Sequence, residues 1–401
     1  MKDVSFIIGS GFSNPYPNHI PGVEELSKLL ASIKSDNIYF HTSRNIVQVQ
    51  SGGDKMSQNN VIYTKFYEKL LKFYLDFDVQ SEFNYEDFFD YYYYRLNEIS
   101  KDIDLNAFID SFKKEFPADY SRLYSASDLL LGVHNIYSQL ISQFLHRDEF
   151  YGDSNYSEFP HYNNFVRLTK EIIANSKLYI HSLNHDLLLE DILKNRDNFS
   201  DGFSDGYQEN GSKYYGEIST NNSNISKQER IRLKYYSDRY SGDICIYKLH
   251  GSIDTYYLSD NTRIKNVPWI LRYFKEIENE NGYTYEQVIQ ETFPDFLTGK
   301  KAKEIFYKQP YYKGLLNHFI ANIQSSALLI FIGYGFGDEM LNHIINRNFD
   351  FNNKPVAIID IVENDQLKNR LPFKISRMKH IQKSISEITP EDVSSIMKLL
   401  L

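Results

Sequence analysis

The sequence predicts an α/β protein with a Rossmann-like parallel sheet, a large helical insertion and no zinc ribbon. Three observations predict this class: short apolar runs spread along the chain, a long helical pattern between the first two runs, and a single cysteine, Cys245. At about 150 residues per domain, 401 residues allow two or three domains, or one domain with a large insertion. We interpret residues 1–401 as one domain whose helical insertion covers about residues 60–175.

The predicted strands are five short apolar runs: Val4–Ile8, Leu178–Leu183, Ile244–Leu249, Leu328–Ile332 and Val356–Ile361. They are aliphatic or β-branched and lack clean alternation, which is typical of parallel strands that are covered on both faces. Three of them end in glycine or small polar residues. In an open α/β sheet the carboxyl ends of the strands are where ligands bind.

The predicted helices carry apolar residues near a 3.6-residue period: Glu24–Ile33, Val61–Phe77, Phe83–Ile99, Ile103–Phe116, Ala126–Phe144 and Tyr162–Ala174. The aromatic run Tyr91–Tyr94 indicates either a helix packed on several sides or a base-stacking surface. The acidic and aromatic stretch Phe83–Tyr94 is either an assembly surface or an ordinary packed helix with a solvated edge.

Two further segments lack a core pattern. Asn198–Tyr240 is polar and rich in Gly, Ser, Asn and Asp, which predicts a flexible surface insertion over about residues 198–240. Pro268–Lys303 indicates mixed helix and loop.

Composition excludes several function classes. With 44 basic and 53 acidic residues the net charge is −9, so we expect no direct nucleic-acid binding. One cysteine excludes disulfide scaffolds, CxxC zinc ribbons and iron–sulfur clusters. The most apolar segment, Ala327–Ile332, is far shorter than the roughly 20 residues of a membrane span. No secretory signal is evident, and we expect a soluble, cytoplasmic protein.

Polar or glycine-rich motifs follow four of the predicted strands. Gly9-Ser10-Gly11-Phe12-Ser13 fits either a loop that approaches a pyrophosphate or a plain tight turn. His181 and His185 are four apart, but on a strand that spacing is too wide for one metal ion. Asn184 and Asp186 share one side of the same extended segment.

The other two motifs follow later strands. His250 leaves an apolar strand just before Gly251, where it is either a catalytic base or a hydrogen-bonded structural residue. The stretch Gly333-Tyr334-Gly335-Phe336-Gly337-Asp338 either contacts a long ligand or clears a helix–sheet contact. Asp360, at the end of the fifth run, fits a hydrogen-bond acceptor for ribose hydroxyls.

Taken in chain order, these motifs resemble the core of the sirtuin family. The family's G-A-G-x-S and I-P resemble Gly9-Ser10-Gly11-Phe12-Ser13 and Ile20-Pro21; its T-Q-N-x-D resembles Ser182-Leu183-Asn184-His185-Asp186; its catalytic H-G matches His250-Gly251; and its late G-(T/S)-S corresponds to Gly333-Tyr334-Gly335. Two features depart from the family's deacylases. The four cysteines of their zinc ribbon are absent, and Pro21 is followed by Gly22-Val23-Glu24 rather than by the family's arginine segment.

The segments K-L-H-G-S (residues 248–252) and I-G-Y-G-F-G-D (residues 332–338) resemble the corresponding segments of sirtuin-like NAD-hydrolysing effectors of bacterial antiphage defence. That resemblance implies a metal-free NAD+ glycohydrolase that releases nicotinamide and ADP-ribose and depletes cellular NAD+ in abortive infection. It also implies a homo-oligomer and a partner ATPase of the HerA type, or alternatively a short Argonaute system. NAD-dependent protein deacylation and non-catalytic NAD sensing remain the alternatives.

The resemblance also implies roles for single residues. Asn184 and His250 are the expected catalytic residues. Gly9, Ser10, Gly11, Phe12 and Ser13 would hold the pyrophosphate. Asp186 would fix the Asn184 loop, and Gly333, Tyr334, Gly335 and Asp360 would line the adenosine side.

Overall fold

The structure is a computed structural model. It describes residues 2–15, 20–41, 46–49, 58–77, 82–98, 102–116, 124–145, 160–194, 199, 202–222, 225–267, 270–280, 282–291, 293–300 and 302–401. Single positions of the predicted segments, such as Ile99 and Asn198, lie outside these ranges.

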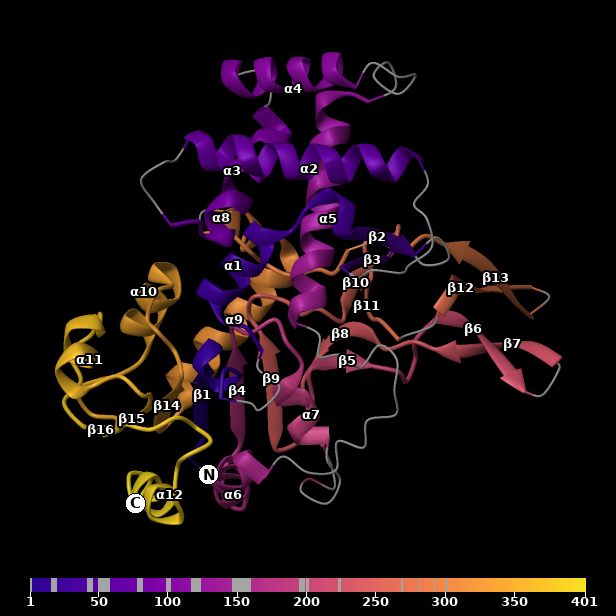
Figure 1. The fold of residues 1–401 in the computed structure, drawn as a ribbon. Coiled ribbons are helices and arrows are strands. Elements are labelled where there is room, and N and C mark those ends of the chain that lie inside the picture. The colour runs from indigo at the N-terminus through magenta and orange to yellow at the C-terminus, as the bar shows by residue number, and fades with distance from the viewer. Residues whose placement is uncertain are drawn as a thin grey trace.

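A six-stranded parallel sheet forms the centre of the molecule (Figure 1). Its strands, in spatial order, are β16 (Met378–Ile381), β15 (Val356–Ile359), β14 (Leu328–Ile332), β1 (Val4–Ile8), β4 (Leu178–Ser182) and β9 (Ile244–Lys248). The five predicted strands are confirmed, each to within two residues of its end, and β16 adds an edge. The α/β class with a parallel sheet is therefore confirmed.

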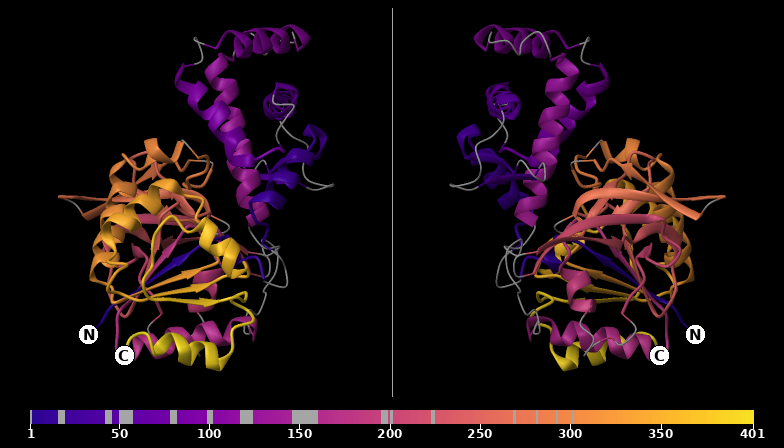
Figure 2. Two further views of the ribbon diagram at one scale, coloured as in Figure 1. Left: turned by 90° about the vertical axis from the view of Figure 1, so that its left-hand side faces the viewer. Right: turned by 90° about the vertical axis from the view of Figure 1, so that its right-hand side faces the viewer.

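Helices cover both faces of this sheet, and alternate strand residues point to opposite faces. Phe6 and Ile8 of β1 pack toward α6 (Asn163–Ile173) and α12 (Pro390–Met397), which lie side by side. Ile7 packs on the other face with residues of α9 (Pro310–Ser325) and α10 (Glu339–Asn348). Figure 2 shows α6 and α12 together below the sheet, close to both chain termini.

Helix ends follow ordinary capping chemistry. α9 and α12 both begin with proline, which has no amide hydrogen to leave unsatisfied in a first turn. Thr389 and Asp392 form a capping box at the start of α12. The remaining helices outside the insertion are α1 (Val23–Ser32), α7 (Leu188–Lys194), α8 (Ala302–Phe306) and α11 (Asn364–Arg370).

The predicted helical insertion contains five α-helices in its described residues. α2 (Gln58–Phe77), α3 (Tyr85–Glu98), α4 (Ile103–Glu115) and α5 (Ala126–Leu145) extend away from the sheet (Figure 2), whereas α6, also within residues 60–175, packs against it. Tyr92 is fully buried and meets Tyr137 edge to face at 5.8 Å, while Arg95 stacks on Tyr91. These contacts within the chain support the packed-helix interpretation of the aromatic run.

The loop predicted within residues 198–240 and the mixed helix and loop predicted for residues 268–303 are wrong where strands form; residues 293–300 and α8 do consist of loop and helix. Both segments contain antiparallel strands: β5 (Gly206–Gln208), β6 (Tyr214–Asn222), β7 (Ile225–Arg232), β8 (Tyr235–Arg239), β12 (Ile270–Asn279) and β13 (Gly282–Val288). With β10 (Thr255–Tyr257) and β11 (Arg263–Lys265) they form two four-stranded sheets. The error has a physical cause. An antiparallel strand with a face exposed to solvent carries polar residues on that face, so it lacks the continuous apolar run that identifies a buried strand.

A short pair, β2 (Ile38–His41) and β3 (Ile46–Val49), was also not predicted. In the described part of the chain, no helix combines the length and apolar character needed to cross a membrane.

Candidate active site

The loops after β1, β4, β9 and β14 meet at one edge of the parallel sheet, because these strands are neighbours and run in the same direction. Backbone hydrogen bonds join the loops directly. The amide of Gly11 donates to the carbonyl of Gly333 at 3.0 Å, and the amide of Leu249 donates to the carbonyl of Ser182 at 2.9 Å. The four sequence motifs that end these strands therefore surround one region.

Gly9, Gly11 and Gly333 allow two of these loops to touch. A Cβ atom on Gly9 would lie 2.6 Å from the carbonyl oxygen of Gly333, and one on Gly11 would lie 2.7 Å from the Cα of Gly333. Gly333 has a φ of +57°, a conformation that strongly favours glycine. The glycines thus have a packing role, whatever ligand the loops hold.

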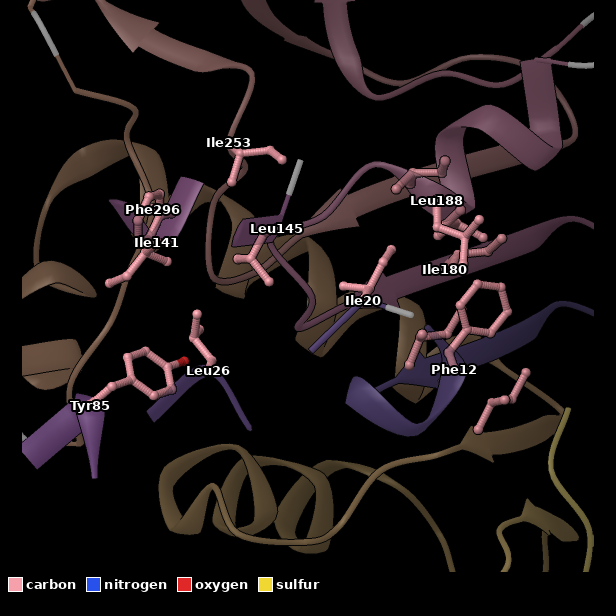
Figure 3. Packing of buried hydrophobic residues seen from close by; sticks show 14 of the residues in the cluster. Phe12, Ile20, Leu26, Tyr85, Ile141, Leu145, Ile180, Leu188, Ile253 and Phe296 are labelled. Carbon is pink, nitrogen blue, oxygen red and sulfur yellow. The ribbon is translucent and has the colours of Figure 1, made fainter. Parts of the chain in front are cut away.

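The predicted pyrophosphate cradle has few open amides. The backbone amides of Gly9, Gly11, Phe12 and Ser13 all donate to carbonyls within the chain. The ring of Phe12 lies in the core, as Figure 3 shows, and its carbonyl accepts a hydrogen bond from Tyr162. Ser10 is exposed. Its side chain is the part of this motif that faces solvent.

Asn184 bridges the loops after β4 and β1. Its Nδ2 donates to the carbonyl of Gly9 and to the hydroxyl of Ser13, both at 3.0 Å. Since both amide hydrogens have these partners, the Oδ1 atom is the part of the side chain left for a ligand or a water.

Asp186 has a structural position rather than an exposed one. Its buried carboxylate accepts a hydrogen bond from the amide of Leu188 at the start of α7. Burial raises the pKa of Asp186, against the opposing charge of Lys248. The Nζ of Lys248 in turn donates to the carbonyl of Asp186 and lies 3.1 Å from the carboxylate of Glu190. These contacts are compatible with the predicted role of Asp186 in fixing the loop that carries Asn184, which stays a prediction.

His250 forms a hydrogen-bonded pair with Asp338. Its Nε2 lies 3.1 Å from the Oδ2 of Asp338, and the two side chains are only 6% and 12% exposed. The second carboxylate oxygen of Asp338 accepts the amide hydrogen of Leu341 at 3.0 Å and so caps α10. The helix start therefore holds the carboxylate that faces the histidine.

The electrostatics favour a neutral imidazole beside an ionised carboxylate. Burial, and then the charge of Lys303, lower the pKa of His250, although Asp338 opposes this shift. Burial alone would raise the pKa of Asp338, but the hydrogen bond and charge of His250 together with the Leu341 amide lower it to about 2. A neutral His250 donates its Nε2–H to Asp338, which leaves Nδ1 as a proton acceptor.

Asp338 is the main residue that the sequence interpretation missed. Its motif was recognised, and an aspartate just before a helix is a normal N-cap signal. The pairing with His250, 88 positions away along the chain, is visible only once the strand order is known.

The remaining predicted residues differ in how far they are exposed. Tyr334 is buried and donates to the side chain of Asn342 at 2.9 Å, so its ring is part of the core. Gly335 is exposed, and a Cβ atom there would meet open space. Asp360 is half-buried at the end of β15 and accepts the amide hydrogen of Val362.

The two histidines of the second motif pack against different aromatic rings. His181 packs between the rings of Tyr247 and Phe319, and burial lowers its pKa to about 3. The ring of His185 lies 4.8 Å from that of Phe296 and 6.1 Å from that of His250. Across the described ranges, no group of three or more His, Cys, Asp or Glu side chains is arranged to hold a metal ion.

The residues of the candidate site that come later in the chain lie within a region that matches a known domain family. Residues 179–374, just under half of the chain, match the family model of the SIR2-like domain. The match contains Asn184, His250, Asp338 and Asp360, whereas Gly9–Ser13 and the helical insertion lie outside it. It supports a sirtuin-like family and NAD-related chemistry in general. No curated protein matches the chain.

Proposed function

We propose that this protein is an NAD+ glycohydrolase that cleaves NAD+ to nicotinamide and ADP-ribose. One observation carries the proposal: the His250–Asp338 pair and Asn184 follow the carboxyl ends of β9, β14 and β4 in one parallel sheet, inside the region that matches the SIR2-like domain. Ligands of open α/β sheets bind at this edge. The open backbone at Gly335, next to Asp338 in the same loop, fits close approach of a ligand.

The reaction needs a general base but no general acid at the leaving group, which suits this site. Nicotinamide is cationic while bound to ribose, so it leaves with the bonding electron pair as a neutral molecule and needs no protonation. A water molecule then attacks the oxocarbenium-like anomeric carbon, and a base takes the water's proton. The protein has to position that water and exclude others.

The residues divide this work according to their geometry. Nδ1 of His250 accepts the proton, either from the water or from a ribose hydroxyl, and Asp338 holds the imidazole in the required tautomer. Oδ1 of Asn184 orients the water or the ribose. Ser10 and the backbone near Gly335 contact the phosphates and the adenosine side, and Asp360 accepts from a ribose hydroxyl.

The wider role follows from the sequence resemblance to antiphage effectors. In this proposal the protein acts in the cytoplasm, depletes NAD+ during abortive infection, and works as a homo-oligomer with a HerA-type ATPase. An enzyme of this kind has to be restrained, so we expect low activity in the isolated chain and higher activity after assembly.

Nicotinamide release with and without an acylated lysine peptide tests the reaction type. The assay uses concentrated protein, alone and with a candidate partner ATPase, beside Asn184→Ala. We expect peptide-independent release that falls at least about tenfold in the variant. Release that requires the peptide would identify a deacylase. Binding of NAD+ without any release, in every mixture, would identify a sensor.

A further inference from the structure

One segment connects the helical insertion to the loop of His250. It comprises residues 293–300 and helix α8, lies between β13 and α9, and is called the strap below. The amide of Leu297 donates to the carbonyl of His250 at 2.6 Å, and the amide of Ser252 donates to the carbonyl of Asp295 at 3.3 Å. Gly251 forms an antiparallel bridge with Phe296. The strap is therefore bonded to the backbone on both sides of Gly251.

The other side of the strap is held by α3 of the insertion. The two carboxylate oxygens of Asp90 accept the backbone amides of Lys300 and Ala302, each at 2.9 Å. The Nζ of Lys303 lies 2.9 Å from the carboxylate of Glu86, and these side chains are only 14% and 16% exposed. Glu86 and Asp90, which belong to the stretch interpreted as either an assembly surface or an ordinary packed helix, are thus engaged within the chain.

Ring contacts add to this attachment. Phe293 meets His134 of α5 with ring centroids 4.7 Å apart, and Phe306 lies 5.1 Å from Tyr93 of α3. Phe296 of the strap and Ile141 of α5 belong to the same buried cluster (Figure 3). Because buried side chains are close-packed, a displacement of α3 or α5 would also displace the strap.

The strap also brings charge to the catalytic pair. His250 is faced by Asp338 from the start of α10, by His185 from the loop after β4, by Lys303 of α8 and the nearby Tyr307, and by Glu86 of α3. After burial, Lys303 is the strongest influence lowering the pKa of His250, and Glu86 acts in the opposite direction. An ion pair that joins the insertion to the strap therefore lies within electrostatic range of the proposed base.

We propose that Glu86 and Asp90 of the helical insertion are positioning residues of the active site, which act on His250 through the strap and Lys303. This inference rests on the proposed function for its catalytic consequence only. It implies that the region matching the SIR2-like domain does not form a complete site, because both carboxylates lie outside residues 179–374.

Charge-removing variants of the full chain test the electrostatic part. NMR titration of labelled histidine, with the His250 signal identified by its loss in His250→Ala, reports the pKa of His250 without any substrate. Glu86→Gln should lower that pKa and Lys303→Met should raise it, each by about 0.5 unit or more, and the double variant should lie near the wild type. Glu115→Gln, which removes an exposed carboxylate paired with Lys69 in the same insertion, should change nothing. Shifts below 0.2 unit in both single variants would overturn this part.

Asp90→Asn tests the mechanical part. Hydrogen exchange of the strap, the Leu297 amide included, should become several-fold faster, and kcat for NAD+ cleavage should fall about tenfold with little change in KM. Glu115→Gln again serves as the control. Unchanged exchange and kcat in Asp90→Asn would contradict the inference. If exchange and pKa change as expected while even the wild type does not cleave NAD+, the proposed function fails and the coupling stands.

Discussion

At the scale of single residues, the proposed chemistry depends on the pairing of His250 with Asp338. His250 could be identified from sequence, because it follows a largely apolar strand and stands just before a glycine. Asn184 could be identified in the same way. Asp338 was not, since its partner comes from a different loop and the N-cap signal explains the aspartate equally well. The glycines at positions 9, 11 and 333 were recognised, but their contact with each other depends on which strands are neighbours.

Asp338→Asn tests the pair with little damage to the fold, because asparagine is as good an N-cap as aspartate and should preserve the start of α10. We expect kcat for NAD+ cleavage to fall by about 100-fold, since the imidazole loses its fixed tautomer. Loss of the negative charge also lowers the pKa of His250 further, so the acid limb of the rate profile should move to lower pH. A variant with full activity and an unchanged profile would show that Asp338 has no part in the reaction.

At the scale of elements, the parallel strands were easier to predict from the sequence than the antiparallel strands. Five of the six parallel strands form largely apolar runs, so their bounds were predicted to within two residues, whereas the edge strand β16, with sequence MKHI, was not predicted. The antiparallel strands β6, β7, β12 and β13 carry many polar residues on exposed faces, and their pairing depends on partners distant in sequence. The strap does consist of the predicted loop and helix, but its position depends on hydrogen bonds to the His250 loop and could not be predicted from its own sequence.

Gly251 is the position where the strap and the histidine loop are closest. Its φ is +77°, and a Cβ atom there would lie 2.4 Å from the carbonyl oxygen of Asp295. Gly251→Ala should lower the free energy of unfolding by about 1–3 kcal/mol and abolish most activity, since the strap has to move away. Urea unfolding and the nicotinamide assay measure the two effects.

Gly242→Ala is the matched control for that variant. Gly242 has a similar φ of +87°, but a Cβ atom there would meet nothing within 4 Å. Gly242→Ala should lower the free energy of unfolding by about 1 kcal/mol, which is the cost of a positive φ alone, and should retain activity. Equal losses of activity in both variants would argue against a specific contact between the strap and the histidine loop.

At the scale of the whole molecule, the site is assembled from both the sheet and the insertion. The sheet supplies the loops, and α3 fixes the strap that lies against them. Sequence periodicity predicted that the insertion is helical, but not which of its faces contacts the sheet domain, because that depends on the path of a strap some 200 residues later in the chain.

Buried histidines should make the molecule sensitive to acid. Burial lowers the pKa of His181 to about 3, so between about pH 6.5 and 3 the unfolded chain binds a proton that the folded chain does not. Stability from this residue is complete above about pH 6.5 and is lost as pH falls, by roughly 3 kcal/mol at pH 4. His181→Phe, placed between the same two rings, should have a smaller loss of unfolding free energy between pH 7 and pH 4. An unchanged pH dependence would contradict this reasoning.

The most direct measurement is the release of nicotinamide from NAD+ by the full chain under its most active conditions, compared with His250→Ala and His343→Ala. His343 is an exposed histidine on α10 and controls for loss of a histidine as such. We predict nicotinamide and ADP-ribose in equal amounts from the wild type and His343→Ala, and a loss of at least about 100-fold in His250→Ala. Equal release by all three proteins would contradict the assignment of the active site.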